Sequence, residues 1–240
     1  MTRTTVTIFH HYAETAMSID TVDPRGRHLG GRALGAAAAF GSTLLALMLL
    51  MGAAHGAEGN LVGNVGRVVG EVSLLRGAES VPAGAGAELR EGDGIVTGPG
   101  SRVEILCADG SSIVIGPDTT VSVAEFAPSS GGASRALMDL ISGILRVTLS
   151  GRTPWQSFEV RSATAVASVR STDWIVDASR VKTGVFVVGG AVAVTSRAGA
   201  GEVVLAAGEG TDVHVNAVPT APKAWGQPRI DDVLARTAMQ

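Results

Sequence analysis

Short apolar runs, separated by glycine-rich turns, constrain the fold of this chain more than any other feature of its sequence. Beyond residue 57 the runs follow one another about every 8–12 residues, a spacing typical of all-β domains. In several runs every second residue is apolar, which is the period of a strand with one buried face. The clearest pairs are Val103/Ile105, Ile113/Ile115, Val121/Val123, Phe158/Val160 and Val213/Val215. We therefore predict an all-β fold whose short antiparallel or mixed strands form a sandwich, a roll or a solenoid-like stack.

Glycine supplies the turns that such a fold needs, since 32 of the 240 residues are glycine. Asp-Gly and Gly-Gly pairs provide the positive φ angles of tight hairpin turns. We expect hairpin turns at the pairs Asp93-Gly94, Asp109-Gly110 and Gly189-Gly190.

Two segments depart from the strand pattern. Residues 127–134 are rich in proline, serine and glycine and predict an exposed loop, and residues 136–142 then show a brief helical pattern. Residues 217–240 predict a proline-rich linker and a short amphipathic helix, which packs on the β-domain or docks a partner. The helical face would carry Ile230, Val233, Leu234 and Ala238.

The first 56 residues are typical of an export segment. Residues 1–32 are cationic, and residues 33–56 contain a long uncharged stretch that ends in small residues, which predicts a signal peptide. A retained membrane anchor is the alternative, because about 20 apolar residues can cross a bilayer. Cleavage would leave a β-domain over residues 57–216 in the periplasm or elsewhere in the cell envelope. An uncleaved anchor would make a single-pass inner-membrane protein.

Composition argues against several classes of function. The net charge is −3 and the arginines are scattered among carboxylates, so we expect no nucleic-acid binding. The sequence contains no G-x-S-x-G motif, and no Ser/His/Asp set can be assembled from its spacing, so we expect no enzymatic activity. Only His214 of the five histidines lies in the predicted β-domain, on the solvent side of its strand, so we expect no metal and no cofactor. The single Cys107 is expected to be a small buried group.

Acidic residues stand at the glycine-rich turns, namely Asp93, Asp109, Asp118 and Glu209. Side chains of this type bond to the local backbone of a turn. Calcium binding would need several oxygens converging within one loop, and the dense D-x-D-x-D spacing is missing. Turn formation is therefore favoured over cation binding.

Three motifs occur in a characteristic order: GDGIVTGPGS from Gly92, DGSSIVIGPDT from Asp109 and VRST from Val169. With the strand runs around them, over about residues 62–215, they resemble the FecR domain family. The last motif of that family normally reads Arg-Gly-Thr, and Ser171 stands here in place of the glycine.

The resemblance implies an extracytoplasmic all-β domain. Full-length members of the family are iron-transport regulators, with a cytoplasmic anti-sigma segment, one membrane span and a periplasmic β-region that receives a signal from an outer-membrane TonB-dependent receptor. Other members are stand-alone exported domains, and this chain looks like one of those. Its expected function is a non-enzymatic binding or signal-receiving module of the bacterial cell envelope, with an envelope protein as partner.

The residues of the three motifs are the candidates for interaction. They are Arg170 and Thr172, which match the family's Arg-Gly-Thr element, Asp173 and Trp174, which follow directly, and Asp93, Asp109 and Gly110 in the two earlier motifs. A structural role is the alternative, in which Arg170 ties a turn by bonding carbonyls or carboxylates.

Two other functions stay open from the sequence. A cell-wall module would bind peptidoglycan or another glycan through exposed aromatic rings, and Trp155, Trp174 and Trp225 are the tryptophans available. An uncleaved segment over residues 33–54 would make a membrane-anchored, signal-transducing regulator of the FecR type. The membrane is an expected partner only in that second case.

Overall fold

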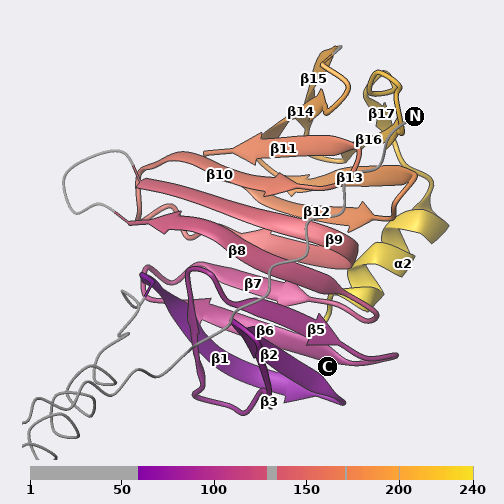
Figure 1. Ribbon diagram of the computed structural model, residues 1–240. Helices are drawn as coiled ribbons and strands as arrows, with labels where there is room; N and C mark the ends of the chain where they lie inside the picture. Colours follow the sequence, from indigo (N-terminus) through magenta and orange to yellow (C-terminus); the bar gives the residue numbers. More distant parts are fainter. Residues whose placement is uncertain (1–58, 129–133, 171, 200, 240) are drawn as a thin grey trace, which may run out of the picture. The chain divides into compact units, whose positions relative to one another are not determined.

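Figure 1 shows the computed structural model of the protein, which describes residues 59–128, 134–170, 172–199 and 201–239. The predicted N-terminal regions, residues 1–32 and 33–56, lie outside the described residues, as does most of the loop predicted over residues 127–134. The described chain consists of strands β1 to β17 and one C-terminal helix, α2. The predicted all-β fold with a short C-terminal helix is confirmed.

The strands pair into two sheets, and we call the first of them sheet A. Neighbouring strands of sheet A are all antiparallel. In spatial order they are β4 (Glu88–Arg90), β1 (Leu61–Val69), β6 (Arg102–Cys107), β7 (Ser112–Ile115), the second part of β9 (Ser134–Thr148), β12 (Asp173–Ala178), β13 (Lys182–Gly189), β16 (Glu209–His214) and β17 (Lys223–Ala224).

Sheet B repeats this arrangement with the remaining strands. In spatial order they are β3 (Glu79–Pro82), β2 (Val72–Arg76), β5 (Gly94–Thr97), β8 (Thr120–Ala127), the first part of β9, β10 (Trp155–Arg161), β11 (Ala165–Val169), β14 (Ala191–Ser196) and β15 (Glu202–Ala206). The β9–β10 pair is parallel, and the other pairs are antiparallel. In both sheets β9 separates strands from the N-terminal half of the chain from strands of the C-terminal half.

β9 passes from one sheet to the other at Gly143. Residues 135–142 pair with β8 in sheet B, whereas residues 143–148 pair with β12 in sheet A. Gly143 has a φ of 98°, and a Cβ there would collide with Thr119. The Thr119 Oγ1 accepts a hydrogen bond from the backbone N–H of Ile144 at 2.9 Å, which holds the chain at the crossing.

The core lies between the inner faces of the two sheets. One hydrophobic cluster joins residues such as Ile105, Leu145 and Val185 of sheet A to residues such as Val121, Met138 and Val194 of sheet B. The alternation in the sequence explains this burial. All residues of the predicted alternating pairs are buried except Val215, which lies just beyond β16. Burying each of the larger apolar side chains contributes about 1.5–3 kcal/mol to folding.

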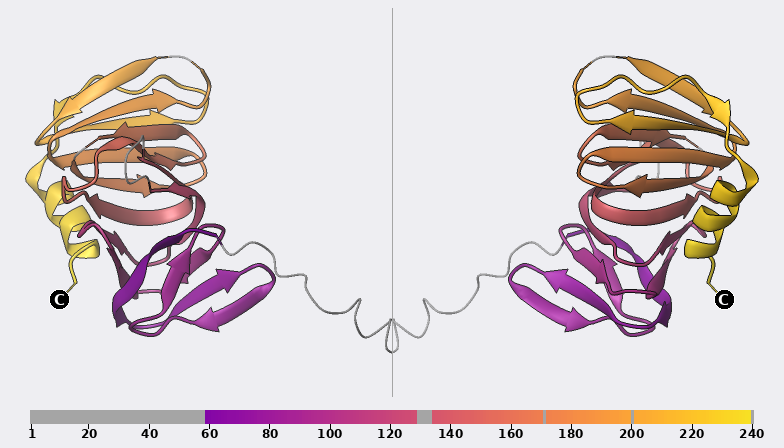
Figure 2. Two further views of the ribbon diagram at one scale, coloured as in Figure 1. Left: turned by 90° about the vertical axis from the view of Figure 1, so that its left-hand side faces the viewer. Right: turned by 90° about the vertical axis from the view of Figure 1, so that its right-hand side faces the viewer.

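The outer face of sheet A is covered by α2 (Gln227–Arg236), and Figure 2 shows this helix against one side of the stacked strands. The contact is apolar, and its cluster consists of Ile144, Ile175, Phe186, Trp225 and Val233, with Ile230 and Leu234 packed against it. Of the two roles considered for the helix, it fulfils the first, packing on the β-domain. The described chain contains no helix with the length and apolar character needed to cross a bilayer.

Three local predictions from the sequence are wrong. Residues 136–142 lie in β9 and not in a helix, because pairing with strands on both sides overrides the helical preference of Ala, Leu and Met. The pairs Asp93-Gly94 and Gly189-Gly190 are not hairpin turns, since the strands that flank each pair belong to different sheets. Asp109-Gly110 does connect the antiparallel neighbours β6 and β7.

Candidate interaction surface

Three of the four residues predicted around position 172 make contacts within the fold. Trp174 is fully buried in the core, and Thr172 donates a hydrogen bond from Oγ1 to the carbonyl of Ala191 at 3.0 Å. The Asp173 carboxylate accepts two hydrogen bonds from the Arg146 guanidinium, at 2.6 and 2.8 Å. These contacts hold the start of β12 against β9 and β14, so the three side chains are engaged within the fold.

Arg170 is the member of this group that faces solvent. Its side chain is exposed and makes no hydrogen bond or ion pair with any residue that the structure describes. The predicted alternative, a turn tied by Arg170, is therefore not seen among the described residues. Arg170 instead lines an open hollow of about 520 Å³, which we call the Arg170 hollow.

The walls of the Arg170 hollow come from strands that are far apart in the sequence. They are Gln156 of β10, Ser168 and Val169 of β11, Thr172, Ala191 and Ala193 of β14, and Val204 of β15. Arg170 carries the formal charge of this lining, and Val204 is 60% exposed. The lining residues include Ser168 but no His or carboxylate that could act as its base.

Asp93 has the local role expected of a turn residue, together with a longer contact. Its carboxylate accepts the backbone N–H of Arg90 at 2.9 Å and two hydrogen bonds from the Arg76 guanidinium at 2.9 and 3.0 Å. The side chain is almost completely buried, so it joins β2 to the turn that follows β4.

Asp109 and Gly110 form the β6–β7 hairpin turn. Gly110 has a φ of 81°, and Asp109 accepts hydrogen bonds from the backbone N–H and the hydroxyl of Ser111, both at 2.9 Å. Partial burial alone would raise the pKa of Asp109, but these hydrogen bonds lower it below its usual value. The prediction that these acidic side chains bond to the local backbone is confirmed at Asp93 and Asp109.

Residues 93–193 match the model of the FecR protein family. The chain therefore carries a FecR domain. The matched segment runs from the start of β5 to the first half of β14, and it includes every candidate interaction residue predicted from the sequence.

Solved structures with a similar arrangement were also found. Two crystal structures of a candidate anti-sigma factor from Parabacteroides distasonis ATCC 8503 align with TM-scores of 0.47 and 0.48, at 17% and 18% sequence identity. The alignments cover 59% of this chain and 64% and 63% of the other, so the chain spans less than two thirds of that protein. A search of curated proteins finds no match.

All three tryptophans of the chain are buried, so they do not form the exposed aromatic platform considered for a glycan. Trp155, Trp174 and Trp225 are 6%, 0% and 6% exposed. Trp155 makes edge-to-face contacts with Phe126 and Phe158, with ring centroids 5.7 and 5.4 Å apart. The idea that exposed tryptophans serve a sugar site is wrong, because Trp155 and Trp174 belong to the core between the sheets and Trp225 to the cluster beneath α2.

Cys107 and His214 lie as the strand pattern predicts. Cys107 is buried, and burial, aided by the nearby Asp109 charge, raises the pKa of its thiol to about 12. His214 is exposed at the end of β16. Within the described ranges, no three His, Cys, Asp or Glu side chains come together in a way that could hold a metal ion.

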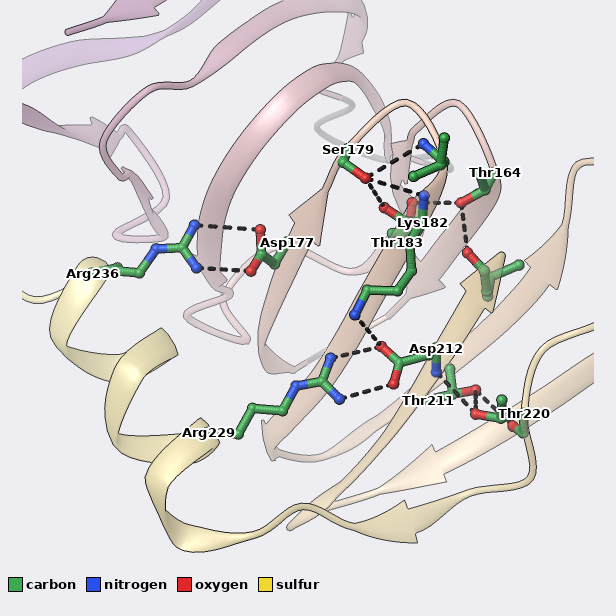
Figure 3. A network of polar contacts seen from close by, with 12 residues as sticks. Thr164, Asp177, Ser179, Lys182, Thr183, Thr211, Asp212, Thr220, Arg229 and Arg236 are labelled. Atoms are coloured by element: carbon green, nitrogen blue, oxygen red, sulfur yellow. Dashed lines mark hydrogen bonds and ion pairs between the residues drawn. The ribbon is translucent and has the colours of Figure 1, made fainter. Parts of the chain in front are cut away.

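The polar network that holds α2 was missed from the sequence, and Figure 3 shows it at close range. The Arg229 guanidinium donates to both Asp212 oxygens at 2.6 and 2.9 Å, and Lys182 approaches the same carboxylate at 3.6 Å. The hydrogen bond from Arg229 lowers the pKa of Asp212 below its usual value, against the effect of burial. At the other end of the helix, Arg236 pairs with Asp177 at 2.8 Å.

Proposed function

We propose that this FecR domain is a non-catalytic, signal-receiving module of the bacterial cell envelope that binds a protein through the outer face of sheet B. One observation carries the proposal. No described helix or strand covers that face, whereas α2 covers the equivalent face of sheet A, and the uncovered face holds the Arg170 hollow.

The character of the hollow fits a protein partner better than a small ligand. The hollow is open and combines a guanidinium that has no partner among the described residues with small polar side chains and an exposed valine. Small-molecule sites enclose most of the ligand surface, whereas protein interfaces combine an arginine with apolar contacts on an accessible face. Arginine is also among the residues whose truncation costs protein interfaces most.

Crosslinking in cells tests the proposal. The full-length chain, with a C-terminal tag, would carry a photo-crosslinking amino acid at Val204 on the outer face of sheet B. The matched position is Leu106, which is 48% exposed and belongs to sheet A. We expect a discrete protein adduct from position 204 that is absent from position 106.

Charge reversal refines the same experiment. Arg170→Glu is expected to abolish the adduct at position 204, because it places a carboxylate where the hollow has its cation. Arg152→Glu makes the same charge change at an exposed site outside the hollow and should preserve the adduct. Equal adducts at positions 204 and 106, or an adduct that survives Arg170→Glu, would argue against binding through this face.

A membrane-anchored regulator of the FecR type is the second candidate, favoured by the match to the FecR family model. Fractionation of cells that express the tagged full-length chain, followed by its intact mass, separates the candidates. A soluble envelope species that begins near residue 57 supports a free module. An uncleaved species in the membrane fraction supports the anchored regulator, and the same β-domain would then receive the signal.

A further inference from the structure

A second hollow, lined by three arginines, lies where hairpin turns from both sheets come together. Its volume is about 490 Å³. We call it the arginine hollow, and its lining consists of Asp139, Leu140 and Ile141 of β9, Arg161 of β10, Ser162 and Ala163 of the β10–β11 turn, Arg180 of the β12–β13 turn and Arg197 after β14. None of these residues lines the Arg170 hollow.

The charges of the arginine hollow are not balanced. Arg161 is neutralised by Asp139, which accepts two hydrogen bonds from its guanidinium, one of them at 2.7 Å. Arg180 and Arg197 are exposed and form no ion pair with any described carboxylate. Two positive charges therefore stand uncompensated in one hollow, on a chain whose net charge is −3.

The guanidinium groups of Arg180 and Arg197 differ in how they are held. The Arg197 guanidinium is held at one nitrogen, because its Nη1 donates to the carbonyl of Ser162 at 3.4 Å. Arg180 makes no hydrogen bond within the described chain, so all five of its donors are available. A guanidinium presents its donors as a planar fork that matches a carboxylate or a phosphate, so each of the two arginines can pair with one anionic group.

An apolar residue in the same hollow narrows the class of occupant. Ile141 is 56% exposed, at an irregularity in the pairing of β9 with β8 and beyond Asp139, the last residue of β9 that pairs with β10. Inorganic anions would leave this side chain in water, and a nucleic acid would need a longer row of cations than three arginines beside a carboxylate provide. An acidic peptide that also carries apolar side chains satisfies both features of the hollow.

We propose that the arginine hollow binds an acidic segment of a protein partner, whose carboxylates pair with Arg180 and Arg197 while an apolar side chain covers Ile141. This inference rests on the proposed role as a protein-binding module and adds the chemistry of the partner. Because the hollow places positive charge beside an apolar side chain, a segment that carries both carboxylates and an apolar residue should bind more tightly than a generally acidic surface.

Fluorescence anisotropy with the purified full-length protein tests the proposal. The probe is a labelled peptide of alternating glutamate and leucine, and the matched probe replaces each glutamate by glutamine. We expect the acidic peptide to bind at least tenfold more tightly than its amide counterpart, with an affinity that falls as salt is added. Inorganic phosphate and a single-stranded oligonucleotide serve as competitors and should not displace the peptide at equal concentration.

Variants then locate the binding. Arg180→Ala and Arg197→Ala should each weaken binding about tenfold, whereas Arg152→Ala, which removes the same charge elsewhere, should leave it within about twofold. Ile141→Ser should weaken the acidic peptide while leaving the folded state intact by circular dichroism. Equal losses from Arg152→Ala and Arg180→Ala, stronger binding of the oligonucleotide, or no preference over the amide peptide would overturn the proposal.

The outcome is independent of the crosslinking experiment. A protein adduct at position 204 with no acidic-peptide binding would refute the arginine hollow and leave the proposed function standing. Acidic-peptide binding without any adduct at position 204 would support the arginine hollow and reject the outer face of sheet B as the interface.

Discussion

The two sheets of this sandwich have the same strand plan, with β9 between strands of the N-terminal and C-terminal halves, yet the outer face of only one sheet is covered. On sheet A the outward positions include Ile144, Ile175 and Phe186, which become buried beneath α2. On sheet B the outward positions include Ser168 and Asp139, which stay accessible. The side chains on the outward positions, and not the strand backbone, decide which face receives the helix.

The covered face also shows what it takes to hold a single helix. Trp225 stacks on Phe186 with ring centroids 5.2 Å apart, and the Arg229 guanidinium lies 3.3 Å above the centre of the Trp225 ring. Gly184 and Gly210 leave room for that ring, because a Cβ on either would collide with Trp225 or Arg229. The uncovered face instead holds the Arg170 hollow and the Arg161–Asp139 ion pair, and no described helix packs on it.

The largest expected difference between the faces comes from truncating the tryptophan. Trp225→Ala should lower the free energy of unfolding by about 3–5 kcal/mol, because it removes the ring that joins α2 to sheet A. Val204→Ala on the uncovered face should change it by less than about 0.5 kcal/mol. Urea titration followed by circular dichroism measures both, and losses of similar size would show that the covered and uncovered faces contribute equally to stability.

A smaller loss of stability, whose size depends on pH, is expected from replacing Asp212, the carboxylate that anchors α2. Asp212→Asn should cost about 1 kcal/mol at neutral pH, because the side chain is partly exposed and its pairs with Arg229 and Lys182 are screened. The folded-state pKa of Asp212 is lowered, so its contribution is present above the unfolded value of about 4 and is lost as pH falls toward the folded pKa.

The matched measurement is the change in unfolding free energy between pH 5 and pH 3 in both proteins. The parent should lose more stability over this interval than Asp212→Asn, which no longer has the titrating group. Some loss will persist in the variant, because the pKa of Asp109 is also lowered. A parent and variant with the same pH dependence would show that Asp212 does not anchor the helix through its charge.

The smallest effect on stability is expected from the ion pair of the uncovered side. Arg161 and Asp139 are 37% and 26% exposed, so Asp139→Asn should change the free energy of unfolding by about 0.5 kcal/mol or less. The same substitution should strengthen binding of the acidic peptide about threefold, because it releases Arg161 and removes a repulsive charge. Weaker binding by the variant would place Asp139 among the groups that the peptide needs.

Much of this fold could be predicted from the strand pattern, because a strand with one buried face carries an apolar residue at every second position. The sequence pattern predicted the core positions from Val103 to Val160 and the helix whose Val233 faces the sheet. It could not predict that β9 serves two sheets, since the crossing at Gly143 depends on Thr119, which is remote in the sequence. Nor could it tell a hairpin turn from a turn that changes sheets.

The candidate surface was less accessible to sequence analysis. The motif directed attention to Arg170, but its neighbours Gln156 and Val204 are brought there by strand pairing alone. Thr172 and Trp174 share the motif with Arg170, yet both are buried, whereas Arg170 precedes β12 and is exposed. An apolar side chain on the outward side of a strand, such as Val204 or Ile141, was the signal that could have marked the accessible hollows.

The shared strand has a consequence for how the chain must be assembled. β1 to β8 are made first, and until β9 arrives they leave β7 at the growing edge of sheet A and β8 at that of sheet B. Each edge presents unpaired backbone groups on which another chain could add a strand. The fifteen residues of β9 pair with both edges, and the free side of β9 then pairs with β10 in sheet B and with β12 in sheet A. The strands of the second half therefore add to a strand that is already paired with the first half.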